Sequence, residues 1–148
     1  MVIGIIGESC TGKTTLAERL KGEIAAEVFS GKDYLSLAKS EAAAKEAFQR
    51  KLEEAMTSGF VIYVISEKKH LAFLPKGALR VLMTAELSVI KERFAARMHG
   101  NLPAPVALML DKKHGCFDTE VHDIHIVSGK TDLGEACAQI VRLTEQAC

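Results

Sequence analysis

The sequence carries no excess charge of either sign, no long hydrophobic run and no leader-like N-terminus. Lysine plus arginine number 19, aspartate plus glutamate also number 19, and the formal net charge of the 148 residues is zero. Proteins that bind duplex DNA usually carry a basic excess that neutralises phosphates, so no nucleic-acid partner is expected. No apolar run approaches the roughly 20 residues that span a bilayer. The first residues lack a basic segment, and together these absences predict a cytoplasmic protein without a membrane partner.

The cysteines also lack a pattern. Metal sites and redox motifs place cysteines close together, often as C-x-x-C, and none of the four cysteines here has such a neighbour. Disulfide frameworks are typical of small secreted chains. We therefore expect free thiols at Cys10, Cys116, Cys137 and Cys148. Cys10 lies in a loop before a predicted helix, where a thiolate is favoured, or it is simply a small residue filling a loop position.

The stretch GESCTGKTT at 7–15 fits the phosphate-loop pattern G-x-x-x-x-G-K-[ST]. A buried apolar strand is predicted before it, at 2–6, and a helix is predicted to begin near Lys13. Backbone N–H groups of such a loop surround phosphates, the lysine reaches the β- and γ-phosphates, and the hydroxyl of Thr14 ligates Mg²⁺. The sequence thus predicts ATP and Mg²⁺ as cofactors. The predicted nucleotide-binding residues are Gly7, Glu8, Ser9, Cys10, Thr11, Gly12, Lys13, Thr14 and Thr15.

Strands and helices alternate along the rest of the chain. Buried strands are predicted by short β-branched apolar runs, and helices by apolar residues at three- and four-residue steps. The order predicts an α/β three-layer P-loop NTPase fold, with about five parallel strands and helices on both faces. No repeat or linker is present, so residues 1–148 are expected to form one domain. Strands are predicted at 2–6, 28–29, 60–66, 79–85 and 122–128, and helices at 13–22, 33–58, 86–99, 106–113 and 132–146, with a break at 100–105.

Two stretches besides the phosphate loop resemble a known family: FSGKDYLSLA at 29–38 and HDIHIVSGKTDLGEA at 122–136. With them the sequence resembles the nucleoside monophosphate kinases, and most closely the cytidylate-kinase-like branch. The resemblance implies an ATP-dependent kinase that transfers the γ-phosphate to a nucleoside monophosphate, a pyrimidine such as CMP. It implies an acceptor-binding helical segment at about 30–58 and a short lid at about 98–118.

The resemblance also assigns roles to single residues. It places Arg93 and Arg97 beside Lys13 as catalytic cations, on one face of a helix next to the lid. It implies acceptor-binding positions at Gly31, Tyr34 and His114. Two acidic residues are further candidates from their places after predicted strands: Asp33 as an acceptor-binding residue, with helix capping as the stronger alternative, and Glu67, which either holds a Mg²⁺-bound water or is a surface charge.

The sequence departs from this family at three arginine positions. Leu35, the segment 66–70 and His114 stand where the family has arginine, and nearby lysines supply charge without the arginine fork. Two alternatives therefore remain beside the nucleoside monophosphate kinase. One is a nucleotide-binding regulatory protein or degenerate kinase with little turnover. The other is a P-loop kinase for a non-nucleotide metabolite, similar to shikimate or gluconate kinases. The sequence predicts no oligomeric state.

Overall fold

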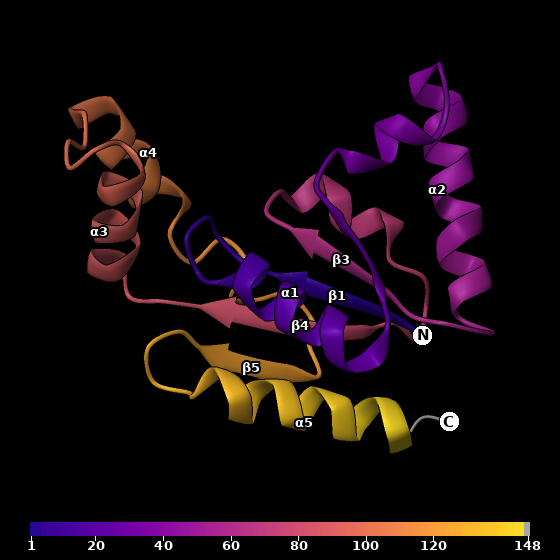
Figure 1. Cartoon of the computed structure of the whole chain (residues 1–148). Helices are drawn as coiled ribbons and strands as arrows, with labels where there is room; N and C mark the ends of the chain where they lie inside the picture. The colour runs from indigo at the N-terminus through magenta and orange to yellow at the C-terminus, as the bar shows by residue number, and fades with distance from the viewer. Residues whose placement is uncertain (147–148) are drawn as a thin grey trace.

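The computed structural model describes residues 1–146 and contains a five-stranded sheet with helices on both faces (Figure 1). All four strand pairs are parallel, and the strand order is β2-β3-β1-β4-β5. The predicted α/β class is therefore confirmed. In chain order the elements are β1 (Val2–Ile6), α1 (Lys13–Ile24), β2 (Glu27–Ser30), the 3-10 helix η1 (Asp33–Leu37), α2 (Glu41–Ala55), β3 (Val61–Ile65), the 3-10 helix η2 (Lys68–Phe73), β4 (Leu79–Thr84), α3 (Leu87–Arg97), α4 (Ala104–Lys113), β5 (Ile124–Val127) and α5 (Leu133–Gln146).

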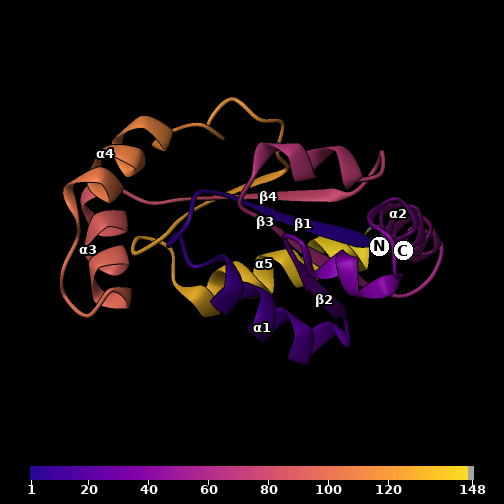
Figure 2. The same cartoon turned by 90° about the horizontal axis from the view of Figure 1, so that it is seen from above.

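The central strands are buried on both faces, which explains why they read as continuous apolar runs. Successive side chains of β3 point to opposite faces, so Tyr63 and Ile65 join one core while Ile62 and Val64 join the other. The first core lies under α2, η1 and η2. The second lies under α1 and α5, which run side by side on the other face (Figure 2).

The helix pair α3 and α4 projects beyond the sheet at the end toward which the strands run (Figure 1). A small separate apolar cluster holds this pair together and includes Cys10 of the phosphate loop, Ile90 and Leu110. Lys91 on α3 also pairs with Asp111 on α4 at 2.6 Å. The segment that the sequence predicts as a lid, 98–118, thus includes the turn between the two helices and the whole of α4.

The structure corrects three helix boundaries. The helical pattern at 33–58 is divided into η1 and α2, and α2 is capped by Ser40, whose hydroxyl accepts from the backbone N–H of Ala43 at 3.1 Å. The cap predicted at Asp33 is therefore wrong for α2, because the backbone is extended at Ala38 and Ser40 and the helix begins only after Ser40. Helix α1 passes through Gly22 and ends before Ala25, which has a left-handed φ of 50°. Helix α4 begins two residues early, since Pro105 fits the first turn, where no N–H partner is required.

None of the helices within residues 1–146 is long and apolar enough to cross a bilayer. The cysteines of this part of the chain, Cys10, Cys116 and Cys137, are free thiols, and Cys148 lies outside the described residues.

Candidate nucleotide and phosphate site

The phosphate loop connects β1 to α1 and curls back on itself. The N–H of Gly7 donates to the carbonyl of Ile65 at 3.1 Å, which ties the start of the loop to β3. A Cβ on Gly7 would lie 2.3 Å from the carbonyl oxygen of Met83, so no larger residue fits there. Thr11 closes the turn, since its hydroxyl donates to the carbonyl of Glu8 at 2.8 Å. Gly12 has a φ of 92°, a left-handed conformation that favours glycine.

Lys13 lies inside this loop, and its side chain is 5% exposed. Its Nζ donates to the carbonyl of Glu8 and to the hydroxyl of Thr11. Burial, with a smaller contribution from the nearby guanidinium of Arg97, lowers the pKa of Lys13 to about 8, while Cys10 and Glu8 oppose the shift. An ammonium held in this way is desolvated and would gain strongly from a phosphate in the loop.

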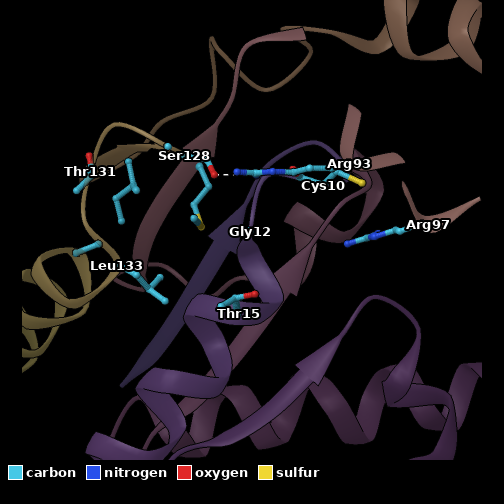
Figure 3. Close-up of a pocket in the computed structure, with 12 residues that line it drawn as sticks. Cys10, Gly12, Thr15, Arg93, Arg97, Ser128, Thr131 and Leu133 are labelled. Atoms are coloured by element: carbon cyan, nitrogen blue, oxygen red, sulfur yellow. Dashed lines mark hydrogen bonds between the residues drawn. The ribbon is translucent and has the colours of Figure 1, made fainter. Parts of the chain in front are cut away.

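Both arginines of α3 reach the loop. The Nη1 of Arg93 donates to the carbonyl of Cys10 at 2.9 Å and to the hydroxyl of Ser128 at 2.8 Å, so it bridges the phosphate loop and the β5–α5 connection (Figure 3). Arg97 points toward the loop from the same helix, and it lines cavities on both sides of the loop (Figure 3). Arg93 therefore has a positioning contact with protein, whereas Arg97 presents its charge to open space.

Two cavities flank the loop. A cavity of about 370 Å³ lies between the loop and the β5–α5 connection, and it combines polar groups such as Ser128 and Thr131 with apolar ones such as Ile126 and Leu133. A second cavity of about 290 Å³ lies on the other side, at the ends of β2 and β3. Its lining residues are Ser9, Cys10, Gly12, Lys13, Thr14, Thr15, Ser30, Gly31, Val64, Ser66 and Arg97. Ligands of open parallel sheets bind at this edge, beyond the carboxyl ends of the strands.

The predicted acceptor residues are divided between different places. Gly31 lines the 290 Å³ cavity, and its carbonyl accepts from the Oη of Tyr63 at 2.8 Å. The carboxylate of Asp33 accepts from the N–H of Ser30 at 2.8 Å and thereby closes the turn after β2. Tyr34 is buried, and its ring stacks on Phe48 with 5.5 Å between centroids.

His114 and Glu67 lie apart from those residues. The Nδ1 of His114 is 3.2 Å from the carboxylate of Glu8, which also accepts from the N–H of Gly115 at 3.1 Å. His114 therefore contacts the phosphate loop, and it does not contact Gly31 or Tyr34. Glu67 is exposed and pairs with Lys69 at 3.2 Å, and the salt bridge lowers the pKa of its carboxyl.

Three site features escaped the sequence prediction. Ser66 lines the 290 Å³ cavity, Ser128 accepts from Arg93, and His70 is buried in η2 with no hydrogen-bond partner for its ring within residues 1–146. Ser66 and Ser128 both follow strands, so the rule that ligands meet the carboxyl ends of parallel strands would have found them. No sequence pattern marks His70.

No family model matches the sequence, and no curated protein matches it. Solved structures with the same fold are found. An uncharacterized protein from Eubacterium ventriosum ATCC 27560 is 16% identical with a TM-score of 0.70, over 98% of each chain. Shikimate kinase from Acinetobacter baumannii, in complex with shikimate, is 14% identical with a TM-score of 0.64, over 99% of this chain and 93% of the kinase. A gluconokinase from Sinorhizobium meliloti 1021 is 16% identical with a TM-score of 0.62, over 99% of this chain and 94% of the gluconokinase.

At these identities the comparisons show a shared fold. The chain shares the α/β fold of these two kinases, and in this chain the phosphate-loop motif follows the first strand of a parallel five-stranded sheet. The neighbours do not single out the cytidylate-kinase-like branch that the sequence resembles.

Proposed function

We propose that this protein is an ATP-dependent kinase that transfers the γ-phosphate to a small-molecule acceptor. The observation that carries the proposal is the position of Lys13, which is buried in a curled loop between two cavities. Lys13 lines the 290 Å³ cavity, and Arg97 lines both cavities. One cavity suits the nucleotide and the other an acceptor, and the terminal phosphate would lie where they meet. A loop that only connected β1 to α1 and bound no phosphate would not require a desolvated lysine.

The residues of this chain fit a Mg²⁺-bound nucleotide. Thr14 is exposed on the first turn of α1 and lines the 290 Å³ cavity, so its hydroxyl is available to the metal. Within the described residues no group of three His, Cys, Asp or Glu side chains forms a metal cage. Mg²⁺ commonly completes its octahedral shell with phosphate oxygens and water, and it would here supply charge neutralisation on the phosphates.

Phosphoryl transfer depends mainly on positioning and on cations around the transferred group. An oxygen of the acceptor would bond to the γ-phosphorus as the bond from that phosphorus to the β–γ bridging oxygen breaks. ADP leaves with the electron pair, and the acceptor proton passes to water. Lys13 and Arg97 would stabilise the charge on the transferred group. Arg93 would act as a positioning residue, because it holds Cys10 and Ser128 together across the nucleotide cavity.

Two acceptor classes have specific support. A nucleoside monophosphate, and a pyrimidine such as CMP in particular, is supported by the resemblance of residues 29–38 and 122–136. A non-nucleotide metabolite is supported by the fold neighbours, which include shikimate kinase and a gluconokinase, and by the absence of arginine at Leu35 and in the segment 66–70. A nucleotide-binding protein with little turnover is the remaining alternative.

Calorimetry with ATP and Mg²⁺, followed by an ADP-release assay, tests the proposal. The acceptors would be CMP, dCMP, UMP, AMP, GMP, shikimate and gluconate. We expect ATP to bind the wild type, Lys13→Ala to lose most of that affinity, and Arg97→Ala to keep ATP binding but lose turnover. Arg142→Ala, on an exposed part of α5, is the matched control.

Equal ATP affinity of folded wild type and Lys13→Ala would refute the nucleotide site. ATP binding without ADP release for any acceptor would instead favour the binding protein.

A further inference from the structure

A third cavity, of about 420 Å³, lies between η1, α2 and η2, and the phosphate loop does not line it. Its floor is aromatic, since Tyr34 and Phe73 contribute to the lining and their ring centroids are 4.9 Å apart. Its other walls carry the side chains of Lys32, Lys45, Lys69 and His70. An apolar floor with a few convergent polar groups is typical of small-molecule sites.

His70 is the unusual residue of this cavity. It is 3% exposed, and neither ring nitrogen has a hydrogen-bond partner within residues 1–146. Buried polar groups in folded proteins are almost always paired, so an unpaired ring calls for an explanation. Burial lowers the pKa of His70, as do the ammonium groups of Lys69, Lys32 and Lys45, whereas Glu67 raises it. A neutral imidazole has one N–H donor and one acceptor nitrogen, and a hydroxyl group can satisfy either.

The charges around His70 favour an anion. Among the described residues that line the cavity, three are lysines and Glu41 is the only acid. Glu41 pairs with Lys45 at 3.3 Å and Glu67 pairs with Lys69 at 3.2 Å, but both pairs are exposed and therefore weak. Lys32 makes no ion pair with any residue from 1 to 146, so its charge is available to a ligand.

This cavity and the 290 Å³ cavity are lined by neighbouring residues of the same two segments. The turn after β2 contributes Gly31 to the 290 Å³ cavity and the next residue, Lys32, to the 420 Å³ cavity. The segment after β3 likewise contributes Ser66 to the first cavity and His70 to the second. A molecule with its reacting oxygen near Lys13 would therefore extend its far end toward His70.

The location of the lysines distinguishes two kinds of acceptor. A nucleoside monophosphate reacts through its phosphate, so its neutral base would be the part that reaches the 420 Å³ cavity. An acceptor that reacts through a hydroxyl and carries an anion at its other end matches the lysines better.

We propose that the 420 Å³ cavity binds the carboxylate end of a small hydroxylated carboxylic acid, with Lys32, Lys45 and Lys69 facing the carboxylate. The two ring nitrogens of His70 are covered by protein in this structure, and the ring would turn toward the cavity to form a hydrogen bond with an acceptor hydroxyl. This inference rests on the proposed kinase function and specifies its acceptor class. His70 is thus a binding residue that selects the acceptor.

Nitrogen-15 NMR of the histidine side chains tests the inference on the full chain. The probes are gluconate, shikimate, CMP and glucose, which is a polyol without a carboxylate. We expect at least one acid to shift the His70 ring signals, and glucose and CMP to leave them unchanged. His70→Phe should weaken acid binding, measured by calorimetry, by about tenfold or more, because a hydrogen bond to the ligand is lost. The exposed His122→Phe is the matched control and should bind the acid as the wild type does.

Phenylalanine suits the aromatic surroundings of residue 70, so His70→Phe should fold. Lys32→Met provides a second test with Lys76→Met as its control, and it should weaken acid binding while the His70 ring remains as the probe. The inference fails if no acid shifts the His70 signals, if CMP alone shifts them, if glucose binds as tightly as the acid that binds best, or if His70→Phe binds that acid like the wild type. ATP binding is measured separately: a protein that binds ATP but no acid refutes only this acceptor class, whereas loss of both refutes the kinase.

Discussion

Nucleotide affinity should fall as the pH rises above about 8, because the ammonium of Lys13 must be charged to meet a phosphate. Burial holds the pKa of Lys13 at about 8 in the free protein. A phosphate beside Lys13 favours the charged form, so the pKa in the complex lies higher than in the free protein. Between the two values the complex binds a proton that the free protein lacks, and the apparent affinity therefore decreases with increasing pH.

The size of the effect follows from the protonated fraction. With a pKa of about 8, about 3% of free Lys13 is charged at pH 9.5, so ATP affinity should fall about thirtyfold, or by about 2 kcal/mol, relative to pH 7. A lysine with an ordinary pKa would still be about nine-tenths charged at pH 9.5 and would leave the affinity almost unchanged. The two cases differ by more than tenfold.

Calorimetric titration with ATP and Mg²⁺ at several pH values from 7.0 to 9.5 measures this. The terminal phosphate of ATP is already ionised over most of this range, so it contributes little to the slope. Lys13→Met should bind weakly at every pH and show a flat profile. Arg142→Ala, on an exposed part of α5, is the control and should keep the wild-type slope. A wild-type affinity that is constant to pH 9.5, or a slope that Lys13→Met retains, would refute the assignment of the phosphate contact to Lys13.

Four further results are expected. Without nucleotide, the unfolded chain holds the Lys13 proton more tightly than the folded chain between pH 8 and 10.5, so the free energy of unfolding of the wild type should gain a contribution that rises with pH over that range. Urea denaturation should show that Lys13→Met lacks this rise. Gly7→Ala should destabilise the protein by about 3 kcal/mol, since the added Cβ would clash with the carbonyl of Met83. Gly22→Ala, at a position of α1 with open space around it, should stabilise the protein by about 0.5–1 kcal/mol. Similar changes in stability for the two variants would contradict this. Tyr63→Phe should lose about 1 kcal/mol with its hydrogen bond to Gly31, and an unchanged melting temperature would count against that bond. Residues 98–118 should exchange amide hydrogens faster than α1 and be protected by an ATP–acceptor bisubstrate analogue; exchange that the analogue does not alter would exclude a lid.

Strands β1 and β3 were predictable because they are buried on both faces and therefore lack polar interruptions. The apolar runs at 2–6, 60–66 and 79–85 each correspond to a strand to within one residue at either end. Their parallel pairing followed from the helices between them. The boundaries of α1 and α2 were less predictable, because Ala25 adopts a left-handed conformation more typical of glycine and because Ser40 caps a helix inside an otherwise helical pattern.

The phosphate loop was predictable from its motif, but the contacts that complete the site were not. Ser128 lies 35 residues after Arg93. A hydrogen bond between them depends on how the chain runs from α3 through α4 and back to the sheet at β5. His70 lies in a 3-10 helix whose sequence has no apolar period long enough to indicate burial. Its lack of a hydrogen-bond partner is a property of its three-dimensional surroundings, which no local pattern records.

The replaced arginines are consistent with the acceptor site that we propose. Leu35 stands at one family arginine position and lines the 420 Å³ cavity, where Lys32 and Lys69 supply the positive charge. An arginine fork fixes the orientation of a carboxylate through two parallel hydrogen bonds, whereas a lysine acts as a point charge on a flexible stem. If lysines hold the anionic end of the acceptor, they select for charge and impose little geometry. Discrimination between acids would then depend on the buried ring of His70, because an acid whose hydroxyl is in the wrong place leaves that ring without a hydrogen-bond partner.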